Sequence, residues 1–400
     1  MTSRIAIVGA GFSGSLLAVA LSRAGFEVTI YEEHRNIGIP PHCTGIISRK
    51  TLSLINEVAG PLPPSVIAAK LKGLRACAYD RCVVINVEGG LIMLNRPRLD
   101  VLLAERAEKY GGSVNTGVRV ENVSLDGRVS LRNGPDRKYD VVIIAEGPVP
   151  RLRKRLSIGL LSEPSYGVNY VTRSSVIGQE LSTEVPPEEY AHVRFDPMYA
   201  PGYMWAIRVG SEYTIIGAAS RRVESIGNLL KRVAGAIEWS YGGRLYLGED
   251  PPSRISAGKV VVFGDAAGLV KPLSGGGLYP QALVADLFLR CISKKAEKND
   301  RELVSCLTKG IRRVHARIGS SSRAARRLLE NTQSMYNILE ILKDKIIITE
   351  YDNHLKTAIE LLLKNNFNIS KLNYIKIKTF ISLIIDITNN LRILFNIIKK

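Results

Sequence analysis

The chain has 400 residues, 46% hydrophobic and 23% charged, which is typical of a globular protein with two or three lobes. A formal net charge of +18 favours anionic partners such as phosphorylated substrates or an anionic membrane surface. Aromatic residues are only 6% and do not alternate with the basic clusters, so we expect no nucleic-acid partner.

The five cysteines form no CxxC pair, which argues against a zinc site and against a secreted disulfide framework. Cys77 and Cys82 could meet across a hairpin, but free thiols in a reducing cytoplasm are the default expectation. No leader is recognised before the first apolar run, and no run of about eighteen apolar residues is free of charge. We therefore expect a cytoplasmic protein with no metal and no spanning helix.

A dinucleotide-binding pattern opens the chain. RIAIVGAG (4–11) is typical of a buried parallel strand, a helical run follows at 15–25, and a second strand ends at Glu32. Gly9 allows a tight turn, Gly11 lets a pyrophosphate approach the backbone, and Gly14 lets the helix pack on the strand. Glu32 occupies the position of the acidic residue that accepts hydrogen bonds from the ribose hydroxyls. The cofactor contacts predicted in this region are Gly9, Gly11, Ser13, Gly14, Glu32 and Glu33.

The next stretch, PPHCTGIIS (40–48), places a thiol in a constrained turn. Pro40 and Pro41 restrict φ, and Gly45 permits close approach of the backbone. The turn follows the second strand, so it can hold Cys43 rigidly beside the reacting ring of the dinucleotide. A small residue that only fills space is the alternative.

The middle of the chain alternates strands with one clear helix. Residues 66–95 predict a hairpin or meander, and 96–112 an amphipathic helix with Leu99, Leu102, Leu103 and Ala107 on one face. A buried strand ends at AEG (145–147), and four strands are expected within 165–225. Tyr203 and Trp205 are two apart and therefore share a face of their strand, either lining a pocket or filling the core.

The second half distinguishes FAD from NAD. Residues 260–290 read as a strand, a Gly-Asp pair, a glycine-rich loop and a helix. Asp265 at the end of the strand could bond the ribityl chain of a flavin, and the amides after Gly275, Gly276 and Gly277 could face its pyrimidine ring. Beyond residue 300 the chain becomes helical and basic. Residues 372–400 read as an amphipathic segment that covers a lipid tunnel, rests on a membrane interface or packs on the body.

These patterns resemble the flavoprotein monooxygenase and reductase superfamily with a glutathione-reductase-like FAD domain, and within it the geranylgeranyl reductase family. The resemblance spans roughly residues 1–300. It is carried by GAGFSG with Glu32, by PPHCTGIIS, by NRPRLD around Arg96 and Asp100, and by FGDAAGLVKPLSGGG. GYMWAI (202–207) is similar to the strand that lines the lipid pocket of the family.

This chain also departs from the pattern. The strand ends in Ile207-Arg208 where an aromatic residue and a proline are usual, and Glu146 and Pro150 replace the usual Asp and Ser of the superfamily.

The resemblance implies an α/β fold, α+β overall: a Rossmann-like FAD-binding domain with a parallel sheet, an antiparallel-sheet substrate domain and a helical C-terminal region. We expect the discontinuous FAD domain at 1–65, 95–160 and 255–300, the lipid domain at 66–94 and 161–254, and the helical region at 301–400. Further cofactor contacts expected are Cys43, Gly45, Arg96, Glu146, Asp265, Gly268, Gly275, Gly276 and Gly277.

The implied reaction is saturation of carbon–carbon double bonds in geranylgeranyl chains of isoprenoid ether lipids or their precursors. An isolated alkene accepts hydride poorly, so an acid should stand near it, and His42 and Cys43 are the candidates. Tyr203 and Trp205 would line the substrate pocket. NADPH, NADH or a ferredoxin would supply electrons, and a monomer, with peripheral contact to the inner face of the cell membrane, is expected.

Two other functions stay open. One is an FAD-dependent monooxygenase of an aromatic or lipid substrate, whose use of O₂ would be coupled to substrate. The other is a non-catalytic escort that binds prenyl lipids, although such a carrier has no need of a complete flavin cradle.

Overall fold

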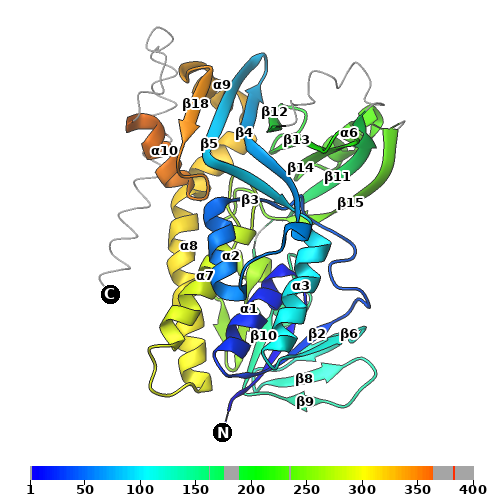
Figure 1. Cartoon of the computed structure of the whole chain (residues 1–400), viewed down its shortest axis with the longest axis vertical. Coiled ribbons are helices and arrows are strands. Elements are labelled where there is room, and N and C mark those ends of the chain that lie inside the picture. The colour runs from blue at the N-terminus through cyan, green and yellow to red at the C-terminus, as the bar shows by residue number, and fades with distance from the viewer. Residues whose placement is uncertain (1, 162, 175–188, 234–235, 364–381, 383–400) are drawn as a thin grey trace.

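The computed structural model describes residues 2–161, 163–174, 189–233, 236–363 and 382 (Figure 1). Apart from Ser382, the expected amphipathic segment at 372–400 lies outside these residues. In the described part of the chain, no helix combines the length and the apolar character needed to cross a membrane.

A six-stranded sheet, here called the parallel sheet, forms the lower half of Figure 1, in the order β16-β17-β10-β1-β2-β6. Its strands β10 and β17 are continuously apolar and buried, as expected for strands of a sheet covered on both faces. Only the edge pair β16–β17 is antiparallel. The bounds are β1 Arg4–Val8, β2 Glu27–Glu32, β6 Ser113–Thr116, β10 Val141–Ile144, β16 Ser256–Ala257 and β17 Val260–Val262.

Helices and a small antiparallel sheet pack against this parallel sheet. α3 is the helix expected at 96–112, with Leu99, Leu103 and Ala107 buried and Leu102 half-buried. The helices are α1 Phe12–Arg23, α2 Arg49–Ala59, α3 Arg96–Lys109, α4 Leu152–Arg155 and α7 Leu278–Ile292. The small sheet contains β7 Val120–Val123, β8 Arg128–Leu131 and β9 Arg137–Lys138.

The upper half is built on a larger, mostly antiparallel sheet, here called the nine-stranded sheet. Its order is β15-β11-β14-β13-β12-β4-β5-β18, and β3 also pairs with β5. The hairpin expected at 66–95 and the four strands expected at 165–225 are confirmed. Its strands up to residue 245 are β3 Ile46–Ser48, β4 Ile67–Ala78, β5 Arg81–Leu94, β11 Ser165–Arg173, β12 Tyr190–Phe195, β13 Gly202–Val209, β14 Tyr213–Ser220 and β15 Ile237–Leu245. α6 (Val223–Val233) covers one of its faces.

In the C-terminal region expected to be helical, 301–400, the described residues also form a strand beside the helices. β18 (Lys345–Ile348) pairs in parallel with β5 at the edge of the nine-stranded sheet. Ile346 and Ile348 are buried while Ile347 is exposed, which is the period of two of an edge strand. The helices around it are α8 Asp300–Glu330, α9 Thr332–Ile341 and α10 His354–Leu363.

The expectation of free cysteines is wrong for four of the five. Cys77 bonds Cys82 across the β4–β5 hairpin, and Cys291 on α7 bonds Cys306 on α8. The folded elements bring the Cα atoms of these pairs to 4.1 and 5.7 Å, short enough for a disulfide. Spacing in the sequence could not show the second pair, because it joins two helices. Cys43 is free.

Candidate flavin and substrate site

Of the three glycines in the first glycine motif, only Gly11 has free space where a side chain would be. Gly9 has φ +106°, and a Cβ there would lie 2.5 Å from the carbonyl oxygen of Ala145. A Cβ at Gly14 would lie 1.9 Å from the carbonyl oxygen of Gly9. At Gly11, the N-cap of α1, a Cβ would meet no atom within 4 Å. Gly9 and Gly14 are therefore needed for packing, whereas Gly11 faces free space at a helix N-terminus, where a pyrophosphate is favoured.

Glu32 stands beside this turn at the end of β2. One carboxylate oxygen accepts a hydrogen bond from the Ala10 N–H at 2.8 Å. The other accepts from the His34 N–H at 2.9 Å and lies 2.6 Å from His34 Nδ1. The neighbouring Glu33 is exposed and pairs loosely with Arg119, at 3.6 Å. Glu32 is thus held at the glycine turn, and Glu33 lies outside it.

A hydrogen-bonded chain joins the two glycine motifs. Ser13 Oγ–H donates to Gln281 Oε1 at 2.8 Å, and Gln281 Nε2–H donates to Asp265 Oδ1 at 2.7 Å. Burial raises the pKa of the Asp265 carboxyl, while Arg96 and the bond from Gln281 oppose the rise. Gln281 was missed by the sequence interpretation. Its position one turn into the helix after the third glycine is the signal that could have found it.

The glycine-rich loop is packed around this aspartate. At Gly277, the N-cap of α7, a Cβ would lie 3.0 Å from Asp265 Oδ1, and at Gly276 it would lie 3.1 Å from Lys271 Cε. Gly275 and Gly268 lie on either side of the same loop. Ser274 Oγ is buried and has no hydrogen-bond partner among the described residues. An unsatisfied buried hydroxyl is costly, and it is the kind of group that a bound polar ligand would satisfy.

Cys43 lies where the turn at 40–48 meets the start of α3. The Gly45 N–H donates to Cys43 Sγ at 3.3 Å, and Gly45 has φ +76° with the carbonyl oxygen of Leu94 2.6 Å from its Cβ position. Arg96 pairs with Asp100 at 3.2 Å, and its guanidinium lies over the ring of Phe12. Burial lowers the pKa of Arg96, but Asp100 and Cys43 outweigh it and the pKa rises. The thiol therefore has a fixed cation beside it.

The side chain of His42 is more exposed than that of Cys43 and has other contacts. Its ring is exposed, and Nδ1 lies 3.0 Å from the carbonyl oxygen of Gly242 on β15. His42 lies close enough to Asp100 and Asp265 to oppose the rise that burial causes in the pKa values of these carboxyls. The two candidate acids thus flank the same region, but only Cys43 contacts Arg96.

The paired aromatic residues on β13 face the glycine-rich loop. Tyr203 O–H donates to the carbonyl oxygen of Ser274 at 2.8 Å, and its ring centroid is 5.6 Å from that of Trp205. Trp205 Nε1–H donates to Asn169 Oδ1 at 2.9 Å, and the indole lies against Gly217, where a Cβ would be 2.4 Å from it. The shared face expected from their spacing is confirmed.

Two further tyrosines reach this region and were missed by the sequence interpretation. Burial raises the pKa values of Tyr203, Tyr241 and Tyr351, and in each case Cys43 contributes to the rise. Tyr351 lies beyond the part of the chain that carried the resemblance. No local pattern identifies it, because it is brought in by the fold.

A buried ion pair ties the C-terminal region to the flavin loop. Lys271 Nζ lies 3.3 Å from Asp352 Oδ1 and 4.4 Å from the centre of the Tyr351 ring. Asp352 also accepts hydrogen bonds from Ser48 and Thr51 at the start of α2. The segment after β18 is therefore part of the wall around the site.

Glu146 has a structural role in the described fold. Its carboxylate accepts hydrogen bonds from the Leu152 and Arg153 N–H groups at 2.7 and 3.1 Å, and it pairs with the buried Arg153 guanidinium at 3.2 Å. It thereby holds the start of α4 to the end of β10. Its expected contact with the cofactor stays a prediction.

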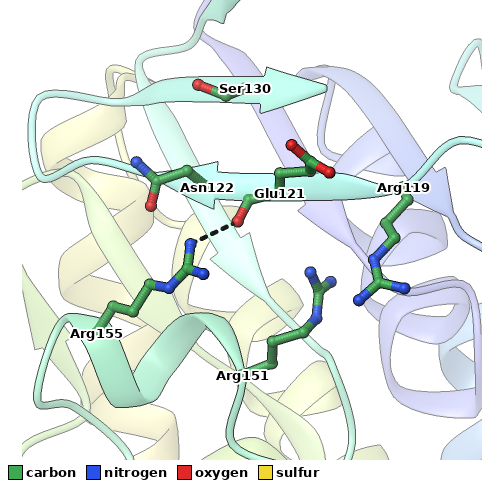
Figure 2. Close-up of a pocket in the computed structure, with 6 residues that line it drawn as sticks. All are labelled: Arg119, Glu121, Asn122, Ser130, Arg151 and Arg155. Atoms are coloured by element: carbon green, nitrogen blue, oxygen red, sulfur yellow. Dashed lines mark hydrogen bonds between the residues drawn. The ribbon is translucent and has the colours of Figure 1, made fainter. Parts of the chain in front are cut away.

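A separate arginine-lined cavity of about 460 Å³ opens between the small sheet and α4. Figure 2 shows the guanidinium groups of Arg119, Arg151 and Arg155 converging there, while the Glu121 carboxylate points away. Arg151 donates to the carbonyl oxygen of Val120 and Arg155 to that of Glu121, each at 2.9 Å. Its lining is entirely polar and includes none of the residues around Cys43.

Known proteins with similar sequences identify the family of this chain. Residues 7–41 match the model of the NAD(P)-binding Rossmann-like domain. The chain is 30% identical over 297 residues to digeranylgeranylglycerophospholipid reductase 1 of Methanopyrus kandleri, covering 68% of this chain and 76% of that protein. It is 25% identical to geranylgeranyl diphosphate reductase of Synechocystis, covering 75% and 78%.

Solved structures share the fold. A geranylgeranyl bacteriochlorophyll reductase-like protein of Thermoplasma acidophilum superposes with a TM-score of 0.74 at 19% identity, covering 90% of this chain and 98% of that one. A 2-methyl-3-hydroxypyridine-5-carboxylic acid oxygenase superposes with a TM-score of 0.62 at 17% identity, covering 82% and 93%.

The cofactor is FAD, and the residues present fit it. Gly11 is open at the first glycine motif, Ser13, Gln281 and Asp265 link the two motifs by hydrogen bonds, and the unsatisfied hydroxyl of Ser274 lies in the second. With the relative from Methanopyrus aligned over most of its length, the chain belongs to the geranylgeranyl reductase family of FAD-dependent oxidoreductases.

Proposed function

We propose that this protein saturates carbon–carbon double bonds in the geranylgeranyl chains of a phosphate-bearing isoprenoid lipid. The observation that carries the proposal is the position of Cys43, between Arg96 of the flavin side and the aromatic face of the nine-stranded sheet. Relatives named for reduction of a geranylgeranyl phospholipid and of geranylgeranyl diphosphate support this class of substrate.

FAD, once reduced, supplies the hydride for such a reaction. The task of the protein is to hold an alkene in place, exclude water and deliver a proton to the second carbon. Tyr203 and Trp205 offer aromatic surface to an apolar chain, and Tyr203 fixes that surface to the flavin loop through Ser274.

Cys43 is the preferred proton donor of the two candidates. Arg96 beside it would stabilise the thiolate that remains after the proton is given up. Solvent can then return a proton to the sulfur. The exposed ring of His42 suits a second role, as a relay between solvent and the site.

The proposal extends to the other expected partners and boundaries. NAD(P)H or a ferredoxin reduces the flavin, the active form is a monomer, and the protein contacts the membrane peripherally. The flavin part comprises 1–65, 95–160 and 255–300, the lipid part 66–94 and 161–254, and residues from 301 onward close the site through Lys271 and Asp352.

The test uses the purified protein under anaerobic conditions. The wild type should be yellow, and after reduction with dithionite it should add 2 Da to a geranylgeranyl lipid for each saturated bond, as measured by mass spectrometry. A flavin-loaded, fully reduced protein that leaves every such lipid unchanged would contradict the proposal.

A monooxygenase is the second candidate, favoured by the fold shared with the oxygenase. It predicts substrate-dependent consumption of O₂ and a product heavier by one oxygen atom. A prenyl-binding escort predicts bound lipid with no change of mass. The same mass measurement, made with and without air, separates all three functions.

A further inference from the structure

A second cavity, of about 490 Å³, opens where β4 pairs with β5, beside the start of α2. Its rim carries Arg49, Lys70 and Lys72, with Glu189 among them. Lys72 pairs with Glu189 at 2.6 Å, so these two charges compensate each other. Arg49 uses its Nε–H on the carbonyl oxygen of Gly89, and Lys70 is exposed with no ion-pair partner in the described parts of the chain. Two positive charges are therefore left for an anionic ligand.

The inner wall of the same cavity is apolar. It is made by Leu71, Val87 and Leu91, whose side chains belong to the buried cluster that also contains Tyr203, with Trp205 packed against it. The cavity wall and the aromatic pair on β13 therefore belong to the same apolar cluster. In this respect the cavity differs from the all-polar arginine cavity of Figure 2.

The backbone links this cavity to the catalytic turn. β3, which begins three residues after Cys43, pairs with β5 so that Ser48 lies opposite Leu91 and Ile46 opposite Met93. Arg49 follows β3 directly as the first residue of α2. One short segment therefore carries the thiol at one end and a cation of the cavity at the other.

We propose that this cavity binds the phosphate group of the isoprenoid substrate, with the apolar chain extending along the cluster towards Cys43. The proposal rests on the proposed function and adds the site of the head group. A phosphate provides two or more anionic oxygens for Lys70 and for the free N–H groups of Arg49, and such charge-assisted bonds are strong and salt-sensitive. The cavity lies outside the flavin cradle, so its cations should affect substrate affinity and leave flavin binding unchanged.

The experiment compares Lys70→Gln and Arg49→Gln with the wild type on two probes, geranylgeranyl diphosphate and geranylgeraniol, which lacks phosphate. For the diphosphate, we expect KM to rise about tenfold in each variant, on the order expected for one charge-assisted bond, with kcat unchanged. For geranylgeraniol, KM should not change. Raising the salt concentration should increase KM for the diphosphate in the wild type more than in the variants.

Lys345→Gln is the matched control, because Lys345 is an exposed lysine on β18, which also pairs with β5, and does not line the cavity. A digeranylgeranylglycerophospholipid, presented in detergent, tests whether the phosphate can also belong to an ether lipid. A rise in KM for this lipid in Lys70→Gln supports a head-group site shared by both substrates, and a rise for the diphosphate alone restricts the site to diphosphates.

Two failures are distinguishable. If the wild type reduces both probes but Lys70→Gln and Arg49→Gln keep the wild-type KM for the diphosphate, the head-group site is overturned and the proposed function stands. If the reduced wild type converts neither probe nor the phospholipid, the proposed function is overturned and the head-group site with it. Since Arg49 also donates a hydrogen bond to the carbonyl oxygen of Gly89 within β5, a folding defect in that variant leaves Lys70→Gln to decide.

Discussion

The two large sheets of this molecule bring different parts of the chain to the site. Around the parallel sheet, the flavin cradle is made largely of backbone: glycines without side chains, helix N-termini and a short hydrogen-bonded chain through Gln281. Around the nine-stranded sheet, the proposed substrate pocket is made of side chains, namely tyrosines and a tryptophan, and the proposed head-group cavity carries lysines. A backbone cradle tolerates few substitutions because any added atom collides, whereas a side-chain pocket can change its specificity residue by residue. Changes in the cradle should therefore remove the flavin, and changes in the pocket should spare it.

The largest effect is expected for Gly11→Val. The new side chain would occupy the free space at the start of α1 where the pyrophosphate must approach, so the protein should be purified without flavin and should show no activity. The measurement is the ratio of flavin absorbance to protein. Gly227→Val is the control, because Gly227 also has free space around it but lies on α6, and it should keep its flavin. Stoichiometric FAD in Gly11→Val would mean that the pyrophosphate does not approach the backbone at Gly11.

Cys43→Ser should keep FAD and lose about 10²-fold in lipid reduction, the usual scale for loss of a positioned acid. The hydroxyl has nearly the size of the thiol but a much higher pKa, so packing is preserved while proton donation is impaired. Single-turnover rates of lipid reduction by the pre-reduced enzyme measure the loss. Reduction of the flavin by dithionite should proceed at the wild-type rate. An unimpaired Cys43→Ser enzyme would leave the turn with a scaffolding role only.

Asp265→Ala tests the carboxylate that Gln281 links to Ser13. Without the carboxylate, Gln281 loses its bond at 2.7 Å, and we expect FAD to bind about tenfold or more weakly, corresponding to 1–3 kcal/mol for a charged hydrogen bond. Titration of the apoprotein with FAD, followed by flavin fluorescence, gives the dissociation constant. Asp265→Asn restores a polar group of the same shape and should recover part of the affinity. Equal affinity in all three proteins would mean that this aspartate does not face the cofactor.

The smallest effect concerns acid stability beneath the cradle. His315 on α8 lies 2.7 Å from the carbonyl oxygen of Ala267 in the turn after Asp265, and burial lowers its pKa to about 4. The unfolded chain takes up a proton near pH 6.5, earlier than the folded protein, so stability is complete above pH 6.5 and is lost as the pH falls towards 4. Between pH 7 and pH 5 the melting temperature should fall by a few degrees. His315→Gln should flatten this dependence, and an unchanged slope would show that other groups cause it.

Much of the parallel-sheet half could be predicted from the sequence, because its signals are local. A strand, a tight glycine turn and a helix follow one another within some twenty residues, and the glycine spacing of Gly9, Gly11 and Gly14 is the pattern typical of such a unit. The shared face of Tyr203 and Trp205 was equally predictable, since alternation along a strand needs no knowledge of its neighbours.

What the tertiary structure decided are the contacts between distant segments. Gln281 bonds Ser13, which lies 268 positions earlier in the sequence. Tyr351 and Asp352 reach the site because β18 pairs with β5, and no sequence pattern near residue 350 predicts this pairing. The Cys291–Cys306 bond and the joining of Arg49 and Lys70 around one cavity have the same origin. A sequence pattern records what a residue needs from its immediate neighbours, whereas the partner it meets across a sheet or between two helices is chosen by the packing of the whole chain.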